Sequence, residues 1–228
     1  MAGILTEPRP RTPPRQWQPY EPVSIGCEQL GEPWLGPPRA FTDVVQSRRS
    51  ADAGPVSWAE VGNLLWHVVL PTGLSNLGRA GMAVQRRAAP SAGGLHPIQL
   101  VCVGDEPGPA RLYDGEKHAF VHLASSAEAH SRNAADVSDL LGRASGCTVR
   151  FVADFWKAEA AYTDPETLIL RDAGALLATV CFYAEWLGLS ARPLGFLGAD
   201  FVPALGFPSP RFVAVGGLQL TKALASNG

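Results

Sequence analysis

The stretch PSAGGLHP at residues 90–97 has the composition of a loop that holds a flat ligand. Glycines such as Gly93 and Gly94 lack a Cβ, so the backbone can approach a planar ring closely, and the Ser91 hydroxyl can hydrogen-bond the edge of that ring. The stretch also has a plainer interpretation, because paired glycines between prolines often form only a turn. Within it we expect His96 to fix the loop by hydrogen bonding rather than to act as an acid or base.

The composition excludes several classes of protein. Charged residues make up 18% of the 228 residues and the formal net charge is -2, so the basic footprint of a nucleic-acid-binding protein is missing. The four cysteines lie far apart without a CxxC pair, which argues against a zinc site and a disulfide scaffold. No secretory signal is visible, and the longest apolar stretch, residues 173–189, carries Glu185 and falls short of a membrane span. We expect a cytoplasmic protein without nucleic-acid or membrane partners.

The chain divides into a proline-rich arm at residues 1–40 and one regular domain at residues 41–228. Proline removes amide donors and disfavours helix, so the arm should be extended rather than a domain. Its apolar anchors, such as Trp17 and Trp34, are more than a purely flexible tail needs, and they suit an arm that wraps a neighbouring subunit.

The elements that must position the loop can be read from the hydrophobic pattern. A short helix from Phe41 leads into RRS at 48–50, and a helix capped by Ser57 with Glu60 precedes the loop. A buried strand at 98–103 follows it. The rest predicts a hairpin at 111–123 turning at Asp114-Gly115, a polar helix at 134–144, strands at 148–153, 191–194 and 211–215, the longest helix at 166–187 ending near Gly188, and a short helix after residue 199. This mixture without βαβ alternation favours an α+β fold.

Five ordered segments carry a resemblance to a known family. They are RRS at 48–50, NLLWHVV at 63–69, PSAGGLHP at 90–97, LYDGEKHAFVHL at 112–123 and LRDAGALLATVCFYAEWLGL at 170–189. Together they resemble the SagB-type branch of the FMN-dependent nitroreductase superfamily, which contains azoline dehydrogenases. The resemblance implies a dimeric nitroreductase-like fold with a mostly antiparallel central sheet flanked by helices, and FMN as cofactor.

The resemblance assigns FMN-binding roles position by position. Arg48 and Ser50 match a segment that holds the flavin phosphate and ring edge, with Arg49 beside them, and a guanidinium suits phosphate. The segment Pro90, Ser91, Ala92, Gly93 and Gly94 matches the one that lies against the isoalloxazine. Leu194-Gly195-Phe196 matches a late loop whose amides approach the phosphate. Lys222 is a weaker phosphate candidate, because a lone C-terminal lysine is normally solvent-exposed.

One departure from the family pattern concerns the cation near the flavin N1 and O2 edge. The family usually has a second basic residue two positions after the serine, where this sequence has Asp52. Arg86 or Arg87 can supply that cation, although either can equally be a surface charge.

The resemblance also implies a reaction. Oxidising an azoline ring to an azole removes a hydride and a proton from adjacent carbons, and the family associates proton removal with a Lys-Tyr pair before the long helix. This sequence blurs that motif: Lys157 follows Trp156 but precedes Ala158, and Tyr162 lies near the tyrosine position after Ala161. Lys157 and Tyr162 are therefore the catalytic candidates, each against the alternative of an exposed helix residue.

Three functions remain open at this stage. The first is an azoline dehydrogenase acting on a peptide or a carrier-bound intermediate, beside a cyclodehydratase or synthetase. The second is an NAD(P)H-dependent reductase of nitro compounds or quinones. The third is a catalytically silent scaffold subunit of a peptide-modifying complex. For the first two, the resemblance implies a homodimer with flavin at the interface.

Overall fold

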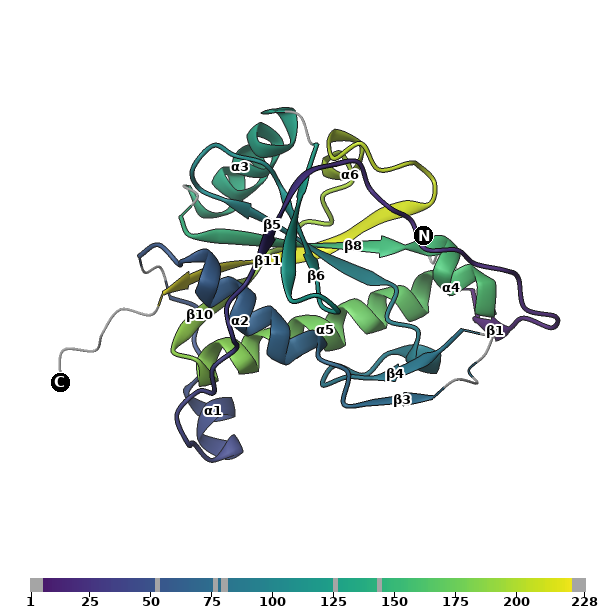
Figure 1. Ribbon diagram of the computed structural model, residues 1–228, viewed down its shortest axis with the longest axis horizontal. Helices are drawn as coiled ribbons and strands as arrows, with labels where there is room; N and C mark the ends of the chain where they lie inside the picture. Colours follow the sequence, from purple (N-terminus) through teal and green to yellow (C-terminus); the bar gives the residue numbers. More distant parts are fainter. Residues whose placement is uncertain are drawn as a thin grey trace.

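The computed structural model describes residues 6–51, 54–75, 78, 82–124, 127–142 and 145–222, and its centre is a twisted sheet (Figure 1). The strand order in this sheet is β10-β11-β8-β5-β6-β7-β2, and all neighbours pair antiparallel. Its strands are β2 (Ser24–Gln29), β5 (Ile98–Gly104), β6 (Arg111–Asp114), β7 (Ala119–Leu123), β8 (Cys147–Asp154), β10 (Leu189–Pro193) and β11 (Phe212–Lys222). The α+β class predicted from the sequence is confirmed.

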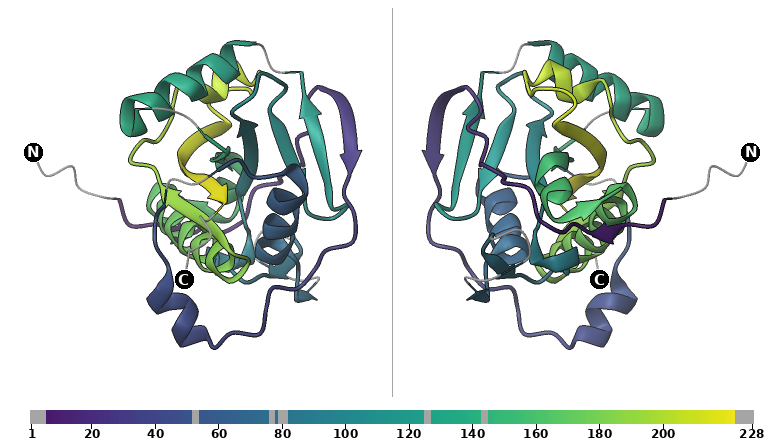
Figure 2. Two further views of the ribbon diagram at one scale, coloured as in Figure 1. Left: turned by 90° about the vertical axis from the view of Figure 1, so that its left-hand side faces the viewer. Right: turned by 90° about the vertical axis from the view of Figure 1, so that its right-hand side faces the viewer.

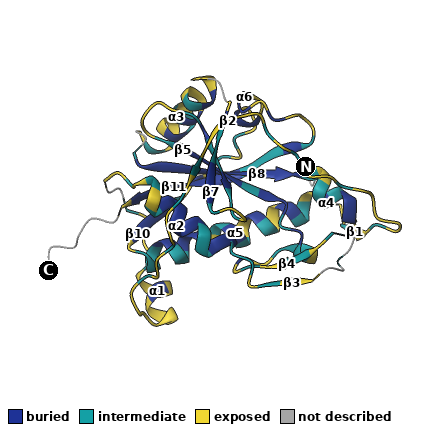
Figure 3. Ribbon diagram, viewed as in Figure 1, coloured by how far each residue is buried: buried dark blue, intermediate teal, exposed yellow. Residues whose placement is uncertain are grey.

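Helices cover both faces of the sheet (Figure 2). The helices are α1 (Phe41–Ser47), α2 (Trp58–Val69), α3 (Ala127–Leu141), α4 (Phe155–Ala161), α5 (Glu166–Trp186) and α6 (Phe201–Ala204). The first face packs on α2 and α5, and the second packs on α3 and α6. Because successive side chains on a strand point to opposite faces, Leu100 and Cys102 of β5 enter the first core while Val101 and Val103 enter the second. All of β8 is buried because both faces of the sheet are covered there, and the central strands β8 and β5 are drawn mostly as buried in Figure 3.

Two predicted helices have the expected ends. Ser57 caps α2 in a capping box with Glu60, as predicted. The predicted core positions of α2 are fully buried: Val61, Leu64, Leu65 and Val68. The long helix α5 ends before Gly188, whose φ of 74° is left-handed. By length and composition α5 is the one described helix that could cross a membrane, but it packs here against β10, β11 and α2. It is a helix of the core, only partly covered.

The last strand was predicted too short. The sequence predicts an end at residue 215, whereas β11 runs from Phe212 to Lys222. Gly216 and Gly217 look like a strand end, but the strand continues through them with a register shift between Ala214 and Gly217. A Cβ at Gly217 would lie 2.6 Å from the Val149 carbonyl oxygen, so the close approach of β8 requires glycine. Similarly, α3 begins at Ala127, seven residues before the predicted start.

The proline-rich arm packs on its own chain. Its residues 24–29 form β2, which pairs with β7 at the edge of the sheet. Near the N-terminus, β1 (Arg9–Pro10) pairs with β9 (Tyr162–Thr163), just after α4. Outside the arm, β3 (Gly73–Ser75) and β4 (Val84–Arg86) form a separate antiparallel pair, and β4 leads into the loop at 90–97. In Figure 1 the first part of the arm runs beside α4.

Candidate active site

The loop at residues 90–97 is fixed by a carboxylate of the long helix. The Ser91 hydroxyl donates to Asp172 Oδ2 at 2.5 Å, and the Ala92 amide donates to Asp172 Oδ1 at 3.0 Å. Ser91 Oγ in turn accepts from the His96 amide at 2.9 Å. The Ser91 proton is therefore used inside the chain, so toward a ring edge this hydroxyl can act as an acceptor but not as a donor.

The glycines of the loop are required by its shape. Gly93 and Gly94 have φ values of 66° and 64°, a region in which residues with a Cβ are strained. A Cβ at Gly93 would lie 3.0 Å from Tyr162 Oη, and one at Gly94 would lie 2.4 Å from a methyl group of Val84. The hydroxyl of the predicted catalytic residue Tyr162 thus lies against the loop.

His96 closes the other end of the loop. Its Nε2 lies 2.7 Å from the Gln85 carbonyl oxygen, the loop-fixing contact expected of it. Burial, and then the nearby Arg87 and Lys157, lower the pKa of His96 to about 4. The ring is therefore neutral at physiological pH and suits a structural role better than proton transfer.

Lys157 lines a cavity of about 200 Å³, and His96 of the loop lines the same cavity. The Asp154 carboxylate caps α4 by accepting from the Lys157 amide at 3.3 Å, so the helix start sets the position of this side chain. Burial, and then the positive charge of Arg87, lower the pKa of Lys157 to about 8. Desolvation disfavours a charged ammonium, so near neutral pH a usable share of this amine is unprotonated and can accept a proton.

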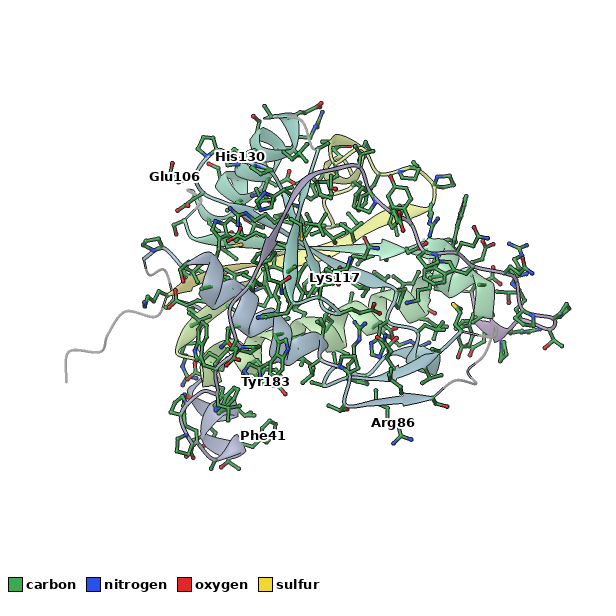
Figure 4. All side chains as sticks on the ribbon, in the orientation of Figure 1. Phe41, Arg86, Glu106, Lys117, His130 and Tyr183 are labelled. Carbon is green, nitrogen blue, oxygen red and sulfur yellow. The ribbon has the colours of Figure 1, made fainter. Side chains whose placement is uncertain are left out.

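Of the two arginines considered for the cation near a flavin, Arg87 lies at the loop and Arg86 does not. Arg87 lines the pockets on both sides of His96, together with Ser91 and Asp172 on one side and Lys157 on the other. Burial lowers its pKa. Arg86 is exposed and projects outward from β4 (Figure 4).

The predicted phosphate-binding residues gather at a different place. Arg48, Arg49 and Ser50 follow α1 and lie beside the first residues of β10, where the Ser190 hydroxyl accepts from the Ala51 amide at 2.8 Å. Lys222 pairs with Leu189 across the same strands, but its ammonium lies 3.1 Å from Glu60 and its side chain is 59% exposed. Glu60 thus neutralises Lys222, while Asp52 lies outside the described residues.

The late loop forms a third location. Leu194 and Gly195 follow the far end of β10, about 16 Å from Ser190 at the rise of an extended strand. The Leu194 amide donates to the Gly217 carbonyl oxygen at 3.0 Å. This amide is therefore not directed at a ligand, contrary to the expectation that it approaches the phosphate. Phe196 lies on the second face of the sheet, with its ring 4.0 Å from the Arg150 guanidinium.

An apolar groove continues from the loop along α5. It encloses about 670 Å³ and includes Phe41 of α1, Ala88 next to the loop, and Tyr183 (Figure 4). Asp172, Thr179 and Tyr183 are spaced seven and four residues apart, which places them on one face of the helix. The groove and the loop therefore share this face of α5.

The phosphate candidates lie on the opposite side of α5. Ser47, the residue before Arg48, donates to Glu185 on that side of the helix at 2.7 Å, and Arg48 lowers the pKa of the Cys181 thiol against the larger, raising effect of burial. Cys181 follows Asp172 by nine residues, which is two and a half turns and about 13 Å along the helix. The pocket lined by Ser91 and Asp172 and the groove along α5 include none of residues 48–50.

Two residues that hold this site together were missed by sequence reasoning. They are Asp172 of the long helix and Asp154 at the end of β8, and the sequence pattern alone assigns no role to either. Asp172 is the one charged residue of the LRDAGALL run that faces the loop, and its position one helical turn before the buried Leu176 is the signal that could have found it. Burial raises the pKa of Asp172 despite the hydrogen bonds from Ser91 and Ala92.

Comparison with known proteins identifies the fold. No protein-family model matches the chain, and no curated protein is detectably similar to it in sequence. Among solved structures, a protein from Ralstonia eutropha described as a nitroreductase matches with a TM-score of 0.67 and 18% identity, covering 93% of this chain and 98% of that one. The Escherichia coli microcin synthetase McbBCD complex with truncated pro-MccB17 bound matches with 0.60 and 15%, covering 86% and 78%.

A third match carries a cofactor. A protein from Desulfovibrio desulfuricans, described as a nitroreductase in complex with FMN, matches with a TM-score of 0.52 and 17% identity, covering 84% of this chain and 93% of that one. The chain thus has the nitroreductase-like fold: a central antiparallel seven-stranded sheet flanked by helices.

Proposed function

We propose that this protein is an FMN-dependent oxidoreductase that dehydrogenates azoline rings to azoles in a peptide natural product. The observation that carries the proposal is that Tyr162 and Lys157 lie beside the same loop, Tyr162 at Gly93 and Lys157 in the cavity that His96 also lines. A buried lysine with a lowered pKa beside such a loop is the kind of group that removes protons. The likeness to a synthetase complex with a peptide bound supports the substrate class.

The residues fit a flat cofactor that carries a phosphate. Arg48 and Arg49 offer guanidinium groups next to Ser50, and guanidinium binds phosphate through paired N–H donors. The groove along α5 has the size and the apolar, aromatic lining typical of a cofactor site. When bound, FMN would take up the hydride that leaves the substrate.

The protein's own groups would handle the proton. In an azoline, the carbon next to the hydride-losing carbon carries the proton that must leave for the ring to become aromatic. The neutral amine of Lys157 is suited to accept that proton, and Arg87 nearby disfavours the charged ammonium before the reaction. Tyr162 is placed to orient the substrate at the Gly93 end of the loop.

We further propose that the working unit is a cytoplasmic homodimer that acts beside a cyclodehydratase or synthetase. The ring-facing loop and the phosphate candidates lie on opposite sides of α5, and a second copy can bring the two halves together. Large apolar side chains on α1 and α5 support this, since Phe41 and Leu170 are both exposed.

The first prediction concerns the cofactor. Purified protein should carry FMN non-covalently, identified by its absorbance spectrum, by release on heating and by mass. Arg48→Ala should weaken FMN affinity roughly 10-fold or more, the typical loss of a hydrogen bond to a charged group. Arg132→Ala is the control, because Arg132 is an exposed arginine on α3 that contacts Glu128. Protein that stays colourless after incubation with FMN would refute the proposal and favour a silent scaffold subunit.

The second prediction concerns the assembly. Light scattering at micromolar concentration should give twice the chain mass of 24.2 kDa. A shared site also predicts that dilution into monomers releases FMN, because each site would lose half of its contacts. A monomer that keeps full flavin occupancy would show that the site is complete in one chain.

The class of reaction can be distinguished from its main alternative. An azoline dehydrogenase should consume oxygen with a thiazoline peptide in the absence of nicotinamide. A nitro or quinone reductase should oxidise NAD(P)H instead, with no response to the azoline.

A further inference from the structure

Part of the N-terminal arm, residues 9–20, lies over the cavity that holds Lys157. Two arginines attach it to α4: the Arg11 amide donates to the Ala161 carbonyl oxygen at 2.8 Å, and the Arg15 amide donates to that of Ala160 at 2.9 Å. Arg15 also contacts Glu159 at 2.8 Å. Beyond them, Trp17, Pro19 and Tyr20 form one wall of the cavity. The arm is therefore docked by several independent contacts.

The indole of Trp17 faces the amine of Lys157. The centre of an indole ring of Trp17 lies 4.9 Å from Lys157 Nζ. Its Nε1 donates to Asp154 Oδ2 at 2.9 Å. The Trp17 side chain therefore packs against the amine and is hydrogen-bonded to Asp154, the residue that caps α4.

Asp154 is engaged by groups other than the Lys157 ammonium. Arg211 donates to both carboxylate oxygens, with Nη2 at 2.7 Å from Oδ2, and Trp17 adds a third donor. Among the described residues, no carboxylate lies within 4.0 Å of Lys157 Nζ. A close anion would raise the pKa of the lysine, so this arrangement leaves the amine free to lose its proton.

We propose that Trp17 is a positioning residue for Lys157, and that residues 9–20 form a roof that keeps water from this amine. The inference rests on the proposed role of Lys157 in proton removal, and it gives the proline-rich arm a part in the site. The arm would then belong to the same functional unit as the domain on which it docks.

The indole has two opposing effects on the lysine. Excluding water disfavours the ammonium, whereas the face of the ring attracts it. Other charged or titratable groups around the cavity are Arg87, His96, Tyr113, Glu116 and Asp154. Burial is the largest cause of the lowered pKa of Lys157 and outweighs the attraction of the Asp154 and Glu116 carboxylates. We expect the loss of this cover to outweigh the loss of the ring's attraction as well. Removing the roof should therefore raise this pKa.

The chain is suited to a direct measurement, because it contains three lysines: Lys117, Lys157 and Lys222. Protein labelled with ¹³Cε-lysine should give three titrating NMR signals, and Lys157→Arg identifies one of them. The wild-type Lys157 signal should titrate near pH 8. In Trp17→Ala its midpoint should rise by about one unit or more as water reaches the amine. Lys117 and Lys222 serve as internal references that should not change between variants.

Trp34→Ala is the matched control, since Trp34 is an arm tryptophan that is 45% exposed and lies at α2, where its amide donates to Asn63. Trp17→Leu, which keeps an apolar cover, should give a smaller rise and replaces the alanine variant if that protein does not fold. An unchanged Lys157 midpoint without Trp17, or an equal shift in Trp34→Ala, would overturn the proposal. The titration needs neither FMN nor substrate, so its failure is distinct from failure of the proposed function.

Discussion

Replacing Lys157 with alanine should lower turnover of a thiazoline substrate by roughly 100-fold or more, the usual loss when a general base is removed. The amine lies in the cavity beside the loop, and its pKa of about 8 provides neutral base near physiological pH. Tyr162→Phe should cost less, because the tyrosine hydroxyl lies at the glycine end of the loop, where we expect it to orient the substrate. FMN content measured in both variants separates lost chemistry from lost cofactor.

The pH dependence gives the same prediction a second readout. The base works only when it is unprotonated, so the rate should rise with pH and level off above the Lys157 pKa of about 8. Lys117→Ala is the control, since that side chain is 73% exposed in the β6–β7 turn. Turnover within a few-fold of wild type in Lys157→Ala, with the same rising limb, would place the base elsewhere.

Many helix ends and turns of the fold could be predicted from the sequence, because the residues that determine them are close together in the chain. The α2 cap depends on Ser57 and Glu60, three residues apart, and the end of α5 depends on Gly188. Both helix ends are formed by hydrogen bonds between residues within one turn of the helix, so they do not depend on tertiary structure. The same holds for the Gly93-Gly94 turn, whose left-handed φ values glycine adopts without strain.

The composition of the site could not be predicted in the same way, because it depends on contacts distant in sequence. Asp172 bonds Ser91 across 81 residues, and Trp17 bonds Asp154 across 137. No periodicity connects such pairs. Helix geometry also separates residues that the resemblance groups into one site, because Arg48 and Ser91 lie on opposite sides of α5. The Leu194 amide, which the resemblance assigns to the phosphate, is instead hydrogen-bonded to Gly217 of β11. Only a folded backbone reveals these separations.

The largest effect on stability is expected at Asp154, whose carboxylate connects the arm, α4 and β11. Its side chain is 3% exposed, and it accepts hydrogen bonds from Arg211, Trp17 and the Lys157 amide. Asp154→Ala would leave the Arg211 guanidinium, itself only 12% exposed, without its partner. Breaking a buried pair in this way costs about 3–5 kcal/mol, and the lost helix cap adds about 1 kcal/mol.

This cost is a large fraction of the stability of an ordinary domain, so the urea midpoint of Asp154→Ala should fall sharply while the slope stays the same. Asp200→Ala is the control, because that carboxylate is 87% exposed and its contact with Arg132 is 3.6 Å long. It should unfold with wild type. Asp154→Asn keeps an acceptor for the cap and should fall between the two. If Asp154→Ala were as stable as Asp200→Ala, the buried pair of Asp154 with Arg211 would contribute no more to stability than an exposed ion pair.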